Sequence, residues 1–247
     1  MEESRIKKTA RNMFFAIGYK LVDTILAFVL RSVFIYTLGI NYLGIKGLFI
    51  NILAVLSLMD LGIGSAIAFS LYRPLAEKDE KKIVALMQLY KKLYTAIGWL
   101  VCVIGISIIP FLNHIINMPT QIDDLYLIYT LSVLNTSMTY FLAYRRTLLI
   151  ADQRSDLCTR VDIVFRFIRC VGLICVMVIT RNYILYLLYD LINTIFSNLV
   201  IAIIVKRKYA YISTNEKREL DRKEKKKIIK YVSSGIFSRI GQTMVAS

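Results

Sequence analysis

The stretch 183–205, YILYLLYDLINTIFSNLVIAIIV, decides the fold of this chain. It carries a single charged residue, Asp190, and it is as long as the roughly 20 residues that a helix needs to cross a hydrocarbon core of about 30 Å. A strand of a membrane barrel would instead alternate apolar and polar residues over about ten positions. Helix is the expected state, because in lipid each backbone polar group must be satisfied within its own segment.

Similar apolar stretches recur along the chain, which is 57% hydrophobic with a mean hydropathy of +0.57. We therefore expect an all-α integral membrane protein. Residues 1–205 are predicted to form an amino-terminal six-helix bundle, 206–230 a basic cytoplasmic linker, and 231–247 the start of a second bundle in a truncated chain or fragment. The six predicted spans are residues 12–39, 45–72, 93–112, 125–144, 161–180 and 183–205, and a seventh begins near 229.

The formal net charge of +15 fits this topology better than it fits nucleic-acid binding. Most of the 32 Lys and Arg lie at 5–11, 73–92, 145–160 and 206–230, all on one side of the predicted bundle. The opposite side holds essentially Lys46 and Arg181. The positive-inside rule places the amino terminus in the cytoplasm. The linker mixes acids with its bases and lies between spans, so anionic lipid is its expected partner and nucleic acid is not.

A few charges fall inside the apolar stretches, where insertion costs roughly 2.5–3.5 kcal/mol each. At 100° per residue, Lys20 and Arg31 lie within about 20° of each other on one helix face, with Asp23 about 60° to the side. This spacing predicts a cationic stripe on the first helix. Lys20 alternatively lies near the interface, where its side chain would reach the headgroups at little cost.

The fifth predicted span carries a second such stripe. Asp162, Arg166 and Arg169 lie within about 60° of one another, and Asp162 with Arg166 forms an expected i, i+4 pair. Two cationic stripes predict a substrate-binding cavity for an anionic ligand, lined by Lys20, Arg31, Arg166 and Arg169. The acidic residues of the spans, which either couple transport to an ion or only neutralise bases, are Asp23, Asp60, Asp162 and Asp190.

Nothing in the sequence predicts catalysis or a metal site. The four cysteines show neither a disulfide pattern nor C-x-x-C spacing. His114 is the only histidine, and it lies in an outer loop. We therefore expect no catalytic residue, no metal, no cofactor and no enzymatic activity.

Three segments carry a resemblance to a known family: 38–49 (LGINYLGIKGLF), 56–64 (LSLMDLGIG) and 71–76 (LYRPLA). They resemble the Wzx-like polysaccharide transporter family of the multidrug/oligosaccharidyl-lipid/polysaccharide exporter superfamily. The resemblance implies a MATE-like fold of two bundles around a central cavity. It also implies movement of undecaprenyl-diphosphate-linked oligosaccharide repeat units to the outer leaflet of the bacterial cytoplasmic membrane. The chain departs from the family in having Asp60 where Glu is usual, and in lacking the second bundle.

Other functions compete with this expectation. A multidrug exporter of the same superfamily would have a cavity richer in carboxylates than in arginines. A non-transporting membrane scaffold of a glycan-synthesis complex is a further alternative. Within such a complex, the partners implied are a polysaccharide polymerase and glycosyltransferases.

Overall fold

The computed structural model describes residues 5–57, 63–112 and 124–213, together with residues 220, 226, 228 and 230. This part of the chain is helical and contains no strand, so the all-α prediction is confirmed. The elements in chain order are α1 (Arg5–Leu38), α2 (Ile40–Ser57), α3 (Ile63–Ala76), α4 (Glu80–Ser107), η2 (Ile109–Phe111), α6 (Leu125–Phe141), α7 (Ala143–Ala151), α8 (Ser155–Thr180), α9 (Tyr183–Lys208) and η3 (Ala210–Ser213).

Three helical segments among the described residues are long and apolar enough to cross a membrane: Glu80–Phe111, Ser155–Thr180 and Tyr183–Lys208. They correspond to the predicted spans 93–112, 161–180 and 183–205. The predicted span 45–72 includes residues of α2 and of α3, with residues 58–62 outside the described part, and 125–144 is divided where α6 ends at Phe141. Asp60, His114 and the segment 231–247 lie outside the described residues.

The tight turns follow from local backbone chemistry. Gly39, which alone separates α1 from α2, has a φ of +94°, a left-handed conformation that glycine adopts without steric cost. Between α8 and α9, Arg181 also has a positive φ and Asn182 caps the next helix. The Asn182 side chain accepts hydrogen bonds from the backbone N–H groups of Ile184 and Leu185.

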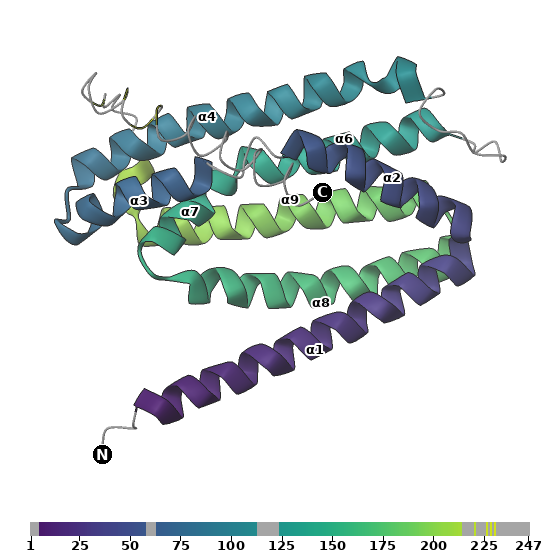
Figure 1. The fold of residues 1–247 in the computed structure, drawn as a ribbon, viewed down its shortest axis with the longest axis horizontal. Coiled ribbons are helices and arrows are strands. Elements are labelled where there is room, and N and C mark those ends of the chain that lie inside the picture. The colour runs from purple at the N-terminus through teal and green to yellow at the C-terminus, as the bar shows by residue number, and fades with distance from the viewer. Residues whose placement is uncertain are drawn as a thin grey trace.

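The chain runs back and forth along one axis (Figure 1), with α4, α6, α9 and α8 lying side by side. α1 packs mainly on α8, and its amino-terminal half diverges from the other helices (Figure 1). The buried apolar residues form two separate clusters, one toward each end of the bundle. Tyr90 and Leu148 belong to one cluster, and Phe34 and Tyr186 to the other. Along α8, Arg166 and Arg169 lie between these two clusters, and each forms a salt bridge with a neighbouring helix.

Candidate functional site: a cationic cavity

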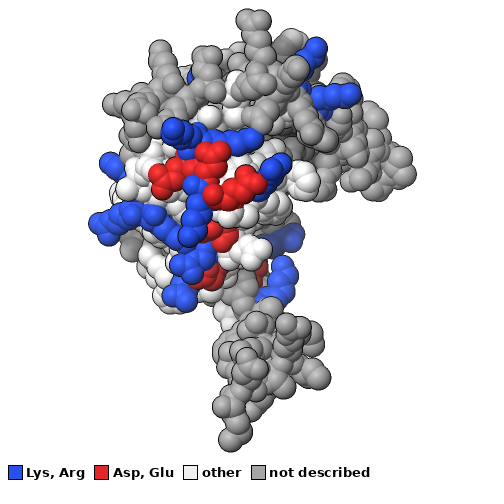
Figure 2. Space-filling model, turned by 90° about the vertical axis from the view of Figure 1, so that its left-hand side faces the viewer, with Lys and Arg blue, Asp and Glu red and all other residues white. Residues whose placement is uncertain are grey.

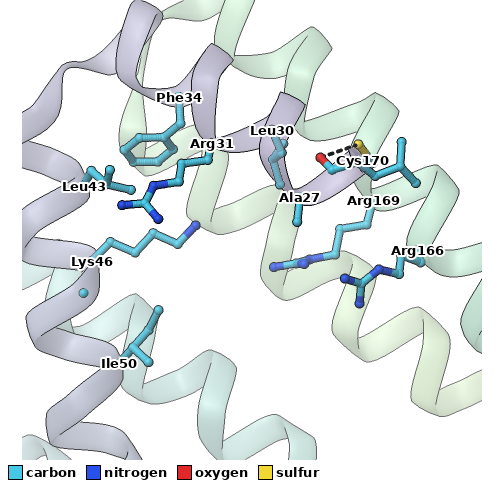
Figure 3. A pocket seen from close by; sticks show the side chains of 12 residues that line it. Ala27, Leu30, Arg31, Phe34, Leu43, Lys46, Ile50, Arg166, Arg169 and Cys170 are labelled. Carbon is cyan, nitrogen blue, oxygen red and sulfur yellow. Dashed lines mark hydrogen bonds between the residues drawn. The ribbon is translucent and has the colours of Figure 1, made fainter. Parts of the chain in front are cut away.

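A cavity of about 340 Å³ opens between α1, α2 and α8. Four basic side chains from these helices line it, and we call it the cationic cavity. Arg31 comes from α1, Lys46 from α2, and Arg166 and Arg169 from α8. Figure 3 shows the Arg31 and Lys46 side chains extending toward each other from facing helices, with both α8 arginines beside them. Three helices thus place their charges around one space.

The structure brings together three of the four cations expected to bind substrate, namely Arg31, Arg166 and Arg169. The predicted helical periodicity explains this, because Arg166 and Arg169 are three residues apart on the face that α8 turns toward α1. Lys20 does not line the cavity and is exposed on α1. Lying three helical turns before Arg31, it is too far along α1 to reach the same space.

Both α8 arginines are paired with acidic residues on neighbouring helices. Arg166 forms a salt bridge to Asp23 on α1, which ties the two helices together. Arg169 binds both carboxylate oxygens of Asp190 on α9, including a 3.0 Å bond to Oδ2. The Asp190 side chain is only 9% exposed, and Asn135 on α6 donates a further 3.3 Å bond to it. Asp23 and Asp190 therefore neutralise the two arginines.

The expected pairing of Asp162 with Arg166 is wrong. Asp162 instead receives two 2.7 Å hydrogen bonds from Arg146 on α7, one to each carboxylate oxygen. Such a fork-to-fork arrangement is stronger than a single contact, and Arg166 meanwhile turns to Asp23. The hydrogen bonds to Asp162 raise the pKa of Arg146 above its ordinary value.

Sequence reasoning missed Lys46 as a cavity residue, because its position in the sequence predicts a place at the outer end of a span. Its Nζ donates a 2.5 Å hydrogen bond to the Tyr186 hydroxyl and lies 4.8 Å from the centre of that ring. It also lies 5.1 Å from the centre of the Phe34 ring. Cation–π contacts of this kind are compatible with a positively charged ammonium. The sequence does contain a signal for this role: Lys46 is a lysine inside an apolar stretch, on the side of the bundle that is poor in basic residues.

Arg31 and Lys46 give the cavity an uncompensated positive charge. Among the described residues, no Asp or Glu forms a salt bridge with either of them. The rest of the wall is largely apolar and includes Leu30, Leu43 and Ile50. A ligand with an anionic group joined to a hydrocarbon portion would match both parts of this wall.

No group of three or more His, Cys, Asp or Glu side chains that could hold a metal ion occurs within the described residues. The four cysteines are free thiols. Cys170 lines the cationic cavity, and its thiol lies 3.9 Å from the Leu26 carbonyl oxygen, a weak hydrogen bond across the α1–α8 contact (Figure 3).

Charged side chains gather at one end of the bundle, on the face shown in Figure 2. This end contains the α3–α4 turn, the α7–α8 turn and the end of α9, whose last turn holds Lys206, Arg207 and Lys208. Acidic residues are interspersed with the bases: Asp152 forms a salt bridge with Lys208 and accepts a hydrogen bond from the Tyr209 hydroxyl. A salt-bridged polar end of this type is typical of a surface in water.

Comparison with family models finds no match to this chain, and no curated protein or solved structure matches it either.

Proposed function

We propose that this protein moves undecaprenyl-diphosphate-linked oligosaccharide repeat units from the inner to the outer leaflet of the bacterial cytoplasmic membrane. In this proposal the described helices belong to one six-span bundle of a two-bundle, MATE-like transporter. The observation that carries the proposal is the pair Arg31 and Lys46, two cations beside an apolar wall that form no salt bridge with a carboxylate of the described residues. The resemblance of segments 38–49, 56–64 and 71–76 to Wzx-like transporters supports it.

The energetics of the task explain why such a cavity would be useful. A sugar diphosphate does not cross hydrocarbon unaided, because each unsatisfied polar group costs several kcal/mol. Cations that lie in a cavity at membrane depth would offset the charge of the diphosphate. Arginine suits this role because its planar fork binds two phosphate oxygens and stays charged when partly desolvated.

The chemistry of the cavity favours an anionic ligand over the cationic drugs that multidrug exporters carry. Arg169 and Arg166 are already neutralised by Asp190 and Asp23, so Arg31 and Lys46 set the net charge. A cationic ligand would be repelled by both. The charged end of the bundle in Figure 2 would face the cytoplasm, together with the amino terminus, by the positive-inside rule.

Binding of undecaprenyl diphosphate to the purified full chain in lipid nanodiscs tests the proposal. The Arg31→Gln variant should bind about 10- to 100-fold more weakly, the loss expected for one hydrogen bond to a charged group. Arg73→Gln is the matched control, because Arg73 is an exposed arginine outside the cavity that forms a salt bridge with Glu77 one turn away. Equal affinity in the wild type and Arg31→Gln, or no binding by the wild type, would contradict the proposal.

A further inference from the structure

A second cavity, of about 530 Å³, adjoins the first on the other side of the α8 arginines. Its floor is α9, and its walls come from α6 and α7 on one side and from α8 on the other. We call it the polar groove. Arg166 and Arg169 line both the polar groove and the cationic cavity, so the two spaces meet at these side chains.

The floor of the polar groove is a stripe of amide and hydroxyl side chains on a helix otherwise suited to a membrane. Asn193, Thr194, Ser197 and Asn198 all line the groove, and each has another member of the set three or four residues away, which places them on one side of α9. Polar side chains inside a membrane helix are costly and usually face a cavity or a partner. This stripe faces the groove.

Asn193 has unused hydrogen-bonding capacity. The residue is only 9% exposed, and its side-chain amide makes no hydrogen bond to another group within the part of the chain that the structure describes. Thr194 and Asn198, by contrast, each donate to a backbone carbonyl oxygen, those of Asp190 and Met138 respectively. The groove therefore presents the Asn193 amide to whatever occupies it.

The charges that border the polar groove are compensated, in contrast to those of the cationic cavity. Arg146 is paired with Asp162, Arg169 with Asp190 and Arg166 with Asp23. The ligand chemistry that fits is consequently neutral and rich in hydroxyl groups. Both donors and acceptors are available to it, because an amide and a hydroxyl each supply both.

We propose that the polar groove binds the sugar residues next to the diphosphate of the substrate, with Asn193 as their main hydrogen-bonding partner. This inference rests on the proposed function, in which the cationic cavity holds the diphosphate. The shared arginines place the two subsites in contact, as one continuous glycolipid requires. The groove volume lies within the 300–1,000 Å³ typical of small-molecule sites.

Two lipid probes separate the subsites: undecaprenyl diphosphate, and the same lipid carrying a disaccharide. Wild-type protein in nanodiscs should bind the glycosylated lipid about tenfold more tightly. Asn193→Leu, a change of similar volume, should abolish this preference and leave the affinity for the bare lipid within about twofold. Ser197→Val is the second variant, in case Asn193→Leu does not fold. Asn51→Leu, at an exposed position on α2, is the matched control and should keep the preference.

The results distinguish failure of this inference from failure of the proposed function. A preference for the glycosylated lipid that survives in both groove variants overturns the inference, as does a wild type without preference. If the wild type does not bind undecaprenyl diphosphate, the proposed function fails. Titration with the free disaccharide then decides: saturable binding that is lost in the groove variants supports a saccharide site, and its absence overturns it.

Discussion

Lys46 on α2 donates a 2.5 Å hydrogen bond to the hydroxyl of Tyr186 on α9, although 140 residues separate them in the sequence. Phe34 on α1 flanks the same ammonium group, so three helices hold one charge in place. The rings of Phe34 and Tyr186 meet edge to face at a centroid distance of 5.3 Å, an arrangement that stabilises the contact further. Lys46 is thus a fixed charge on the wall of the cationic cavity.

Removing this charge should weaken the binding of an anionic lipid. We expect Lys46→Met to lower the affinity for undecaprenyl diphosphate about 10- to 100-fold, because the methionine keeps the apolar stem and loses the cation. Tyr186→Phe keeps the charge and removes its anchor, so it should cost less, about fivefold. Nanodisc binding measurements check both. The same affinity for Lys46→Met and the wild type would show that Lys46 does not contact the ligand.

The sequence predicts the helices better than the contacts between them. Apolar runs and helical periodicity place Arg31, Arg166 and Arg169 on faces that do converge. Periodicity within one helix says nothing about which neighbouring helix supplies a partner. The periodicity of α8 therefore predicts a pair of Asp162 with Arg166 on the same helix, whereas Asp162 binds Arg146 on α7.

The distribution of charge between two cavities is likewise a property of the assembled bundle. Asp190 is separated from Arg169 by a helix–helix turn, and only antiparallel packing of α8 and α9 brings them together. The polar groove depends on the same packing. Nothing in the sequence distinguishes Asn193, which is unpartnered among the described residues, from Asn198, which donates to a carbonyl.

Removing one partner of the Arg169–Asp190 salt bridge should destabilise the bundle more than removing both partners. Asp190→Leu leaves Arg169 without its carboxylate at membrane depth. Fully buried pairs cost about 3–5 kcal/mol when one partner is lost. The Arg169 side chain is 37% exposed, so we expect about 2 kcal/mol. The double variant Arg169→Leu/Asp190→Leu should recover most of this loss, because it removes both charges.

Thermal unfolding of the wild type, Asp190→Leu, Arg169→Leu and the double variant, in one detergent and at one concentration, completes this double-mutant cycle. The expected outcome is a coupling energy of at least about 1 kcal/mol between the two positions. If the loss of unfolding free energy in the double variant equals the sum of the losses in the two single variants, the pair contributes no net interaction.

Gly172 on α8 should not tolerate a larger side chain. A Cβ atom at this position would overlap the ring of Tyr189 on α9, whose hydroxyl donates a 3.0 Å hydrogen bond to the Ile168 carbonyl oxygen. We expect Gly172→Ala to displace the Tyr189 ring at about 1–3 kcal/mol, the usual cost of overpacking, of which the higher helix propensity of alanine offsets about 1 kcal/mol. Thermal unfolding measures the effect, and the Gly172→Ala/Tyr189→Ala variant should relieve the overlap.

Gly47→Ala is the matched control for stability, because nothing lies within 4 Å of a Cβ built there. Alanine favours a helix interior over glycine by about 1 kcal/mol, so this variant should be as stable as the wild type or more stable. Equal stability of Gly172→Ala and Gly47→Ala would contradict the close α8–α9 contact.

Tyr209 should make the charged end of the bundle sensitive to alkaline pH. The residue is buried, and its hydroxyl donates a 2.5 Å hydrogen bond to Asp152. Burial, and then this hydrogen bond, raise the pKa of Tyr209 above its ordinary value of 10. A raised pKa in the folded state contributes stability that is present below pH 10 and is lost as pH rises beyond it, because the unfolded chain ionises first.

Tyr209→Phe isolates this effect from the other tyrosines. At pH 7 it should be about 1 kcal/mol less stable than the wild type, the usual net loss for one hydrogen bond. Above pH 10 the wild type loses the contribution of Tyr209 at about 1.4 kcal/mol per pH unit, and the variant does not. The two unfolding free energies should therefore converge near pH 11, as measured by thermal unfolding at constant ionic strength. A difference that stays constant from pH 7 to 11 would show that Tyr209 ionises equally easily in the folded and unfolded chains.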